Sequence, residues 1–114
     1  LVFKTAATVP DRVGAGATFH GGGLVTDRPD SPHLLAPKIK ARMYIAIAAS
    51  DDTRQPDAKD KLREAFAAAH VPAQIEVYAG TQHGWCVPDH SVFDAAGAER
   101  HWKRLTTFFA ETLS

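Results

Sequence analysis

The chain has 114 residues, 45% of them hydrophobic, which is the size of one ordinary domain with a buried core. Thirteen Lys and Arg residues balance thirteen Asp and Glu residues, so the composition favours neither a nucleic acid nor an anionic membrane as a partner. The single cysteine, Cys86, excludes an internal disulfide framework, and neither a membrane-spanning run nor a signal-peptide pattern is present. We therefore expect a soluble, cytoplasmic protein.

The first quarter of the chain predicts one helical segment and one short strand. Residues 1–8 have the pattern of the end of a helix, which Pro10 terminates because the residue before a proline avoids the α region. Residues 13–19 are small and apolar and predict a strand that other backbones can approach closely. The run His20-Gly-Gly-Gly ends this strand.

The middle of the chain contains the most apolar stretch. Residues 42–48 are almost continuously hydrophobic, which is typical of a strand buried on both faces of a parallel sheet. The segment before it has too many helix and strand breakers for a long element, and we expect an ordered loop with one helical turn near residues 33–36. The breakers are Pro29, Pro32 and Pro37.

Two helices and one more strand are predicted after residue 56. Apolar residues recur at helical spacing from Asp57 until Val71-Pro72, and residues 74–78 predict the third strand. Helical periodicity resumes over residues 93–113, where we expect a buried, structural stripe. Its members are Trp102, Leu105, Phe108, Phe109 and Leu113.

The order of these elements indicates an α/β fold. Strands alternate with helices over short links, and such units form parallel strands joined by right-handed connections. We therefore expect a sheet of about three parallel strands with flanking helices. No internal repeat or low-complexity tract is present.

Polar residues follow the last two predicted strands. Asp51 and Asp52 come just after the buried strand, and His83 lies in the loop Gly80-Thr81-Gln82-His83-Gly84-Trp85 that follows the next one. The carboxyl ends of parallel strands share one edge of a sheet, where an Asp can orient a His that transfers protons. Taken alone, the Asp pair is more typical of a solvated turn near a helix cap, and His83 is equally typical of a surface His in an ordinary loop. Together, the acid followed by His matches the order of the last two members of an α/β-hydrolase triad.

Three segments together give the chain a resemblance to a known family. The run His20 to Asp27, the turn Asp52 to Pro56, and the segment Tyr78 to Trp85 resemble the carboxyl-terminal half of the dienelactone hydrolase family. Members of that family are α/β-hydrolases that cleave esters or lactones with a Cys-Asp-His or Ser-Asp-His triad. The resemblance spans nearly the whole chain and implies no cofactor.

The resemblance also implies roles for individual residues. The family acid stands four residues before a proline, which selects Asp52 and leaves Asp51 as the alternative; the triad histidine falls on His83. By their positions, His20 and Trp85 are expected to bind substrate.

The nucleophile of the family has no counterpart in this sequence. The Gly-x-Cys-x-Gly or Gly-x-Ser-x-Gly turn on which it stands is absent. By resemblance, Leu1 begins in the helix that leaves that turn, so residues 1–114 are expected to be the carboxyl-terminal part of a single α/β-hydrolase domain. The alternative is a non-catalytic α/β interaction domain.

Substitutes for the missing nucleophile are disfavoured. The run from His20 resembles a lipase oxyanion loop, but no nucleophile turn follows it. Cys86 has no evident neighbouring cation or helix start to lower its pKa, which favours an inert thiol. A metal site formed by His83, Cys86 and His90 would have no recognised ligand spacing, and none is expected.

The strand at residues 13–19 also predicts association. In the family this strand pairs with the one that leads into the nucleophile. Without that partner its backbone groups would be open to pairing, and we expect a homo-oligomer formed through this edge or through the uncovered helix face. The substrate of the intact protein is expected to be a small ester or lactone.

Overall fold

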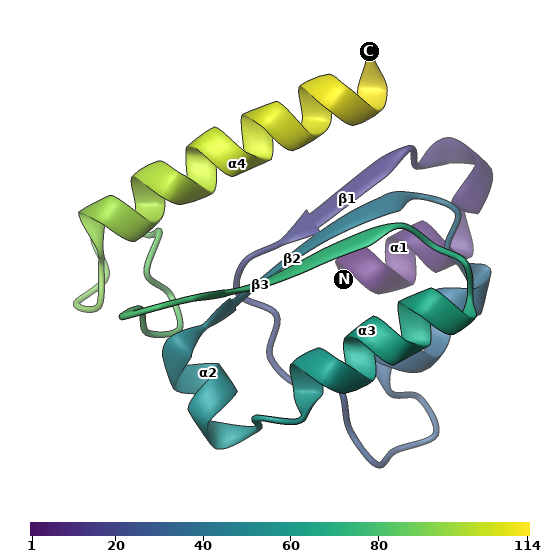
Figure 1. Ribbon diagram of the computed structural model, residues 1–114, viewed down its shortest axis with the longest axis horizontal. Helices are drawn as coiled ribbons and strands as arrows, with labels where there is room; N and C mark the ends of the chain where they lie inside the picture. The colour runs from purple at the N-terminus through teal and green to yellow at the C-terminus, as the bar shows by residue number, and fades with distance from the viewer.

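The computed structural model describes all 114 residues and contains one sheet with helices on both faces (Figure 1). The strands are β1 (Ala15–Thr18), β2 (Arg42–Ala48) and β3 (Ala73–Tyr78). The helices are α1 (Val2–Thr8), α2 (Ala49–Arg54), α3 (Ala58–Ala68) and α4 (Ala95–Leu113), with two short 3-10 helices, η1 (Pro10–Arg12) and η2 (Pro32–Lys38). The predicted α/β class and the three strands are confirmed.

The sheet has the order β1-β2-β3, and both pairs of strands are parallel. In register, Gly16 lies beside Met43, and Ile45 lies beside Ile75. Strand order therefore equals chain order, as expected for consecutive strands joined by connections that cross a face of the sheet. All three carboxyl ends consequently lie at one edge.

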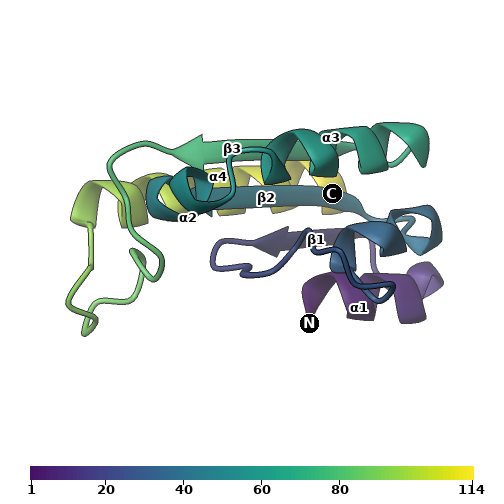
Figure 2. The same cartoon turned by 90° about the horizontal axis from the view of Figure 1, so that it is seen from below.

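One face of the sheet is covered by α1, η2 and α3. Alternate residues of β2 point into this layer, and the rings of Phe66 from α3 and Phe3 from α1 form a T-shaped pair at a centroid distance of 5.5 Å. Figure 2 shows α1 and α3 packed along different strands. The largest buried members of this core are Phe3, Ile39, Met43, Ile45, Ile47, Leu62, Phe66 and Ile75.

The opposite face is covered by α4, which is capped by the Asp94 carboxylate accepting the Gly97 N–H at 2.7 Å. The remaining residues of β2 point toward this helix, and β2 is therefore buried on both sides, as its sequence predicts. The core on this face consists of Tyr44, Ala46, Ala48, Tyr78, Trp85 and Phe108.

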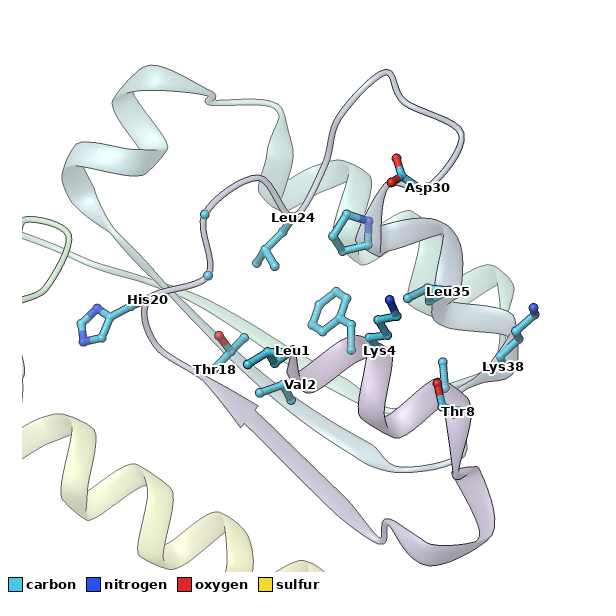
Figure 3. A pocket seen from close by; sticks show the side chains of 15 residues that line it. Leu1, Val2, Lys4, Thr8, Thr18, His20, Leu24, Asp30, Leu35 and Lys38 are labelled. Atoms are coloured by element: carbon cyan, nitrogen blue, oxygen red, sulfur yellow. The ribbon is translucent and has the colours of Figure 1, made fainter.

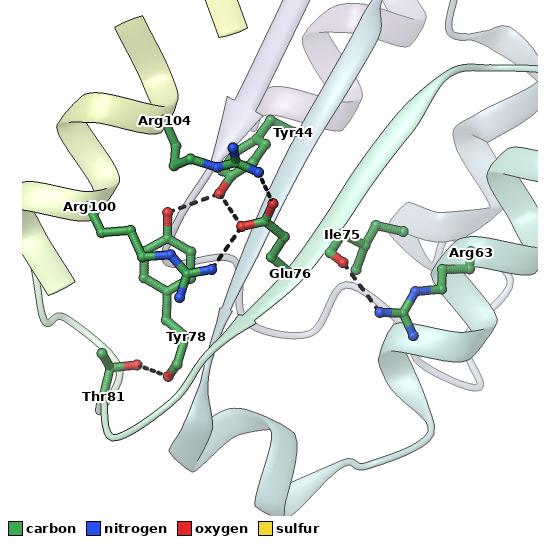
Figure 4. A network of polar contacts seen from close by, with 8 residues as sticks. All are labelled: Tyr44, Arg63, Ile75, Glu76, Tyr78, Thr81, Arg100 and Arg104. Atoms are coloured by element: carbon green, nitrogen blue, oxygen red, sulfur yellow. Dashed lines mark hydrogen bonds and ion pairs between the residues drawn. The ribbon is translucent and has the colours of Figure 1, made fainter. Parts of the chain in front are cut away.

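A polar network anchors α4 to the sheet (Figure 4). Glu76 of β3 accepts hydrogen bonds from Arg100 and Arg104 of α4 and from the Tyr44 hydroxyl. Burial raises the pKa of Glu76, but the bonds from Arg104 and Tyr44 outweigh burial and leave this pKa below its ordinary value. Arg100 also lies over the Tyr78 ring, 4.1 Å from its centroid. The carboxylate thus stays charged and fixes the helix orientation.

The predicted stripe of α4 is wrong in two members. Phe108 is buried, but Trp102 and Leu113 are 56% and 59% exposed. The packed face runs through Ala98, His101 and Phe108, and His101 packs on Phe19 at a ring distance of 3.8 Å. Trp102 follows His101 directly, so it points about 100° away from that face.

The remaining differences concern boundaries and one short helix. The segment after β2 was expected to be a turn, but it forms α2, and the helical turn near residue 33 extends to η2. No helix combines the length and apolarity needed to cross a membrane.

Candidate active site

Each strand of the sheet ends next to one polar residue of the candidate site. His20 follows β1, Asp51 lies in the first turn of α2 directly after β2, and His83 lies in the loop after β3. Because the strands are parallel and adjacent, these three loops meet at the carboxyl edge, where α2 marks the end of β2 in Figure 1.

His83 and Asp51 form the central contact. His83 Nδ1 lies 2.8 Å from Asp51 Oδ2, and the two side chains are 45% and 23% exposed. In the arrangement where Nδ1 donates its proton to the carboxylate, Nε2 of the same ring is left to accept or give a proton. This is the orientation that a carboxylate imposes on a proton-transferring histidine.

The expectation that Asp52 contacts His83 is wrong in this structure. The Asp52 carboxylate instead pairs with Lys59 Nζ at 2.8 Å. Because the segment is helical rather than a turn, one residue along the chain rotates the side chain by about 100°. Asp51, the alternative acid, therefore faces His83, and Asp52 faces α3.

The loop that carries His83 is fixed to the start of α2 by its backbone. The Ser50 hydroxyl accepts the His83 N–H at 3.1 Å, and the Ser50 N–H donates to the Thr81 carbonyl at 3.2 Å. Gly84 has a φ of +97°, a conformation that side chains rarely adopt, which explains the glycine directly after His83.

His20 holds the other side of the same loop. Its Nδ1 accepts the Gly84 N–H at 3.2 Å, and its Nε2 lies 2.7 Å from Cys86 Sγ. The His20 and His83 rings are 5.6 Å apart. Burial lowers the pKa of His20, and nearby His83 lowers it further. His20 is therefore a neutral neighbour of His83.

Cys86 has a histidine neighbour that sequence reasoning missed, because 66 residues separate the pair. The geometry nevertheless disfavours a thiolate–imidazolium pair. An imidazolium carries a proton on both nitrogens, but His20 Nδ1 accepts the Gly84 N–H and is therefore unprotonated. The single proton of the neutral ring is on Nε2, which faces the Cys86 sulfur. Burial also raises the pKa of the Cys86 thiol. A reactive thiol needs the opposite shift.

Trp85 does not lie where a substrate-binding side chain would. Its side chain is fully buried in the core beneath α4, 5.1 Å from the Tyr78 ring between centroids. Its indole N–H has no hydrogen-bond partner. The role that the structure supports for Trp85 is packing of the site loop onto the sheet.

Two cavities meet at the glycine loop after β1. The smaller, about 300 Å³, contains Asp51 and His83 together with Arg54, Gln55 and the glycines 21–23. The larger, about 700 Å³, runs along α1 and reaches the site only at His20 and its neighbouring glycines; in Figure 3 the His20 ring extends away from the other lining side chains. The smaller cavity is the one that the acid–histidine pair lines.

No group of three or more His, Cys, Asp or Glu side chains has the geometry to hold a metal ion. In particular, His83, Cys86 and His90 do not form such a group. The contacts of the site are those of an acid–base pair with supporting hydrogen bonds.

A parallel sheet flanked by helices, with an acid and then a histidine after consecutive strands, defines an α/β-hydrolase type of fold. A sequence profile of the dienelactone hydrolase family matches residues 1–113, and the chain belongs to this family. No curated protein is a significant match to the sequence.

The solved structures agree with this assignment at the level of the fold. The crystal structure of a protein from Klebsiella pneumoniae, provisionally described as a dienelactone hydrolase, superposes with a TM-score of 0.83 at 23% identity. The match covers 96% of this chain and 46% of the Klebsiella chain. The sequence therefore spans about half the length of this solved relative.

Proposed function

We propose that residues 1–114 are the carboxyl-terminal part of an α/β-hydrolase domain and supply the acid and base of an ester- or lactone-cleaving site. The observation that carries the proposal is the 2.8 Å contact between His83 and Asp51 at the carboxyl edge of the sheet. Membership of the dienelactone hydrolase family supports the reaction class. The single thiol, Cys86, is consistent with a cytoplasmic location.

In the proposed reaction His83 transfers protons and Asp51 orients it. A thiol or hydroxyl gives its proton to His83 Nε2 as its sulfur or oxygen attacks the carbonyl carbon of the substrate. The His83 imidazolium, stabilised by the Asp51 carboxylate, then returns the proton to the leaving alkoxide. Water hydrolyses the acyl intermediate by the same two proton transfers, and a small ester or lactone is the substrate class.

The nucleophile is proposed to come from outside residues 1–114. No Gly-x-Cys-x-Gly or Gly-x-Ser-x-Gly turn occurs in the sequence, and the only thiol is held by a neutral His20. The parallel strand β1 is open on the side away from β2, which supports docking of a further strand there.

An activity assay separates this proposal from a non-catalytic interaction domain. The 114-residue chain alone should hydrolyse p-nitrophenyl acetate no faster than the same concentration of free imidazole. Fusing the amino-terminal half of a dienelactone hydrolase, with its nucleophile turn, in front of Leu1 should produce turnover that His83→Asn abolishes.

The control for this assay is the same fusion with the nucleophile replaced by Ala, which should be inactive although folded. Turnover by the chain alone that Cys86→Ala removes would contradict the proposal, because it would make Cys86 the nucleophile. A folded fusion without turnover would favour the interaction domain.

Association is a second proposal about the isolated chain. We propose that it forms a homo-oligomer through β1, because one row of β1 backbone groups has no partner strand and exposed Leu1 lies at the start of the adjacent α1. Light scattering at high micromolar concentration should give at least the dimer mass.

A proline at Ala17 tests which edge is used, because proline cannot donate a hydrogen bond to an added strand and is tolerated at edges. The dimer should weaken in Ala17→Pro, provided that circular dichroism shows a folded chain. A well-folded monomer of the unsubstituted chain at high micromolar concentration would overturn the proposal.

A further inference from the structure

We propose that His20 is a positioning residue, which holds the loop of His83 in place by accepting a hydrogen bond at Nδ1 and therefore has to stay neutral. The inference deepens the proposed function and rests on it, since the loop matters only if His83 transfers protons. Its basis is that one imidazole, from the end of β1, contacts the loop after β3 through both of its nitrogens.

The geometry assigns one tautomer to His20. The Gly84 amide is a donor only, so the Nδ1 atom 3.2 Å away is unprotonated. A neutral ring then carries its proton on Nε2, which points at Cys86 Sγ 2.7 Å away. The two contacts bracket the residues directly after His83 and fix them relative to β1.

The two sides of the His83 loop are held by different strands. On the β2 side, Ser50 accepts the His83 N–H, and Asp51 contacts its ring. On the β1 side, His20 is the side chain bonded to the loop, and its ring also meets Trp85 edge to face at 4.7 Å. Without the His20 contacts the Gly84 N–H would lose its acceptor, and the loop would be held by Ser50, Asp51 and the buried Trp85 side chain.

The charged groups around His20 favour its neutral form on balance. Burial and the neighbouring His83 and His90 lower the pKa of His20, whereas Asp51 raises it. Cys86 is adjacent with a raised thiol pKa, and His101 of α4 has a pKa lowered by burial and by His20. Acid therefore breaks this contact, because a proton on His20 Nδ1 removes the acceptor for the Gly84 N–H.

Nuclear magnetic resonance of the imidazole nitrogens tests the tautomer directly in the unsubstituted chain. The expected result is an Nε2–H tautomer for His20 at pH 7.5, and a midpoint below its ordinary pKa of 6.5. A His20 that carries its proton on Nδ1, or that titrates at or above the ordinary pKa, would overturn the proposal. This measurement needs no variant and no turnover.

Three variants separate hydrogen bonding from packing. Asn places its amide oxygen near the position of Nδ1, Gln places its amide nitrogen near Nε2, and Phe keeps a ring but has no polar atom. Hydrogen exchange of the Gly84 amide should stay within about twofold in His20→Asn and become at least about fivefold faster in His20→Phe and His20→Gln. The Nδ1–H fraction of His83 should fall in the same two variants.

The matched control is His70→Asn, an exposed histidine at the end of α3 whose positive φ of 56° Asn tolerates. It should leave Gly84 exchange unchanged. Equal exchange in the Asn and Phe variants would show that His20 only packs and would refute the positioning role. An inactive fusion with the expected His20 tautomer would instead refute the proposed function.

Discussion

Replacing Asp51 by Asn will lower the turnover number of the completed hydrolase by about 10⁴-fold, which is the typical loss when a triad acid becomes an amide. The physical reason is the tautomer of His83. An amide nitrogen facing Nδ1 favours the ring with its proton on Nε2, which cannot accept a proton from the nucleophile. The measurement is p-nitrophenyl acetate turnover by the fusion described above.

Asp52→Asn is the matched control, because it makes the same chemical change one residue away. Asp52 pairs with Lys59 rather than with His83, so this change leaves the partner of His83 Nδ1 in place. Turnover should therefore stay within about threefold of the unsubstituted fusion. If Asp52→Asn causes the larger loss, the spacing of the family motif is the better guide, and Asp51 is not the acid of the complete site.

Replacing Trp85 by Ala will destabilise the chain by about 3–5 kcal/mol, the usual cost of deleting a large buried aromatic side chain. Trp85 is fully buried against Tyr78 and other members of the core under α4. A loss of this size is a large part of the stability of an ordinary domain. Urea unfolding followed by circular dichroism measures it.

Two further variants define the cause of that loss. Trp102→Ala removes the same side chain from a position that is 56% exposed, and the free energy of unfolding should change by about 0.5 kcal/mol or less. Trp85→Phe should cost less than Trp85→Ala, because it keeps an aromatic ring and removes a buried N–H without a partner. If Trp85→Ala and Trp102→Ala lowered the free energy of unfolding equally, the packing described for α4 would be wrong.

The strands and the histidine of the site could be predicted because short-range patterns determine them. The apolar run of β2 and the glycines around His83 are local signals, and parallel strands bring consecutive loops to one edge. The choice between Asp51 and Asp52 as the partner of His83 could not be predicted from local patterns. It depends on whether the segment is a helix and on where Lys59 lies, and the family spacing favoured the residue that faces Lys59.

Two other features depend on the packing of distant elements. A helical pattern indicates which residues share a face, but His101, a polar residue, occupies the packed face of α4, and the apolar Trp102 does not. The contact of His20 with Gly84 and Cys86 joins segments more than sixty residues apart. Its only signal in the sequence is that both segments follow strands that end at the same edge.

The strands lie in the sheet in the same order as in the chain, so recombination can transfer the residues of the site as one unit. His20, Asp51 and His83 follow consecutive strands, so their mutual contacts lie within one continuous stretch of the gene. Recombination between related hydrolases at a point before β1 transfers Asp51, His83 and the positioning residue His20 together. An exchange between β2 and β3 separates His83 from both Asp51 and His20, so the loops of the two parents would have to match.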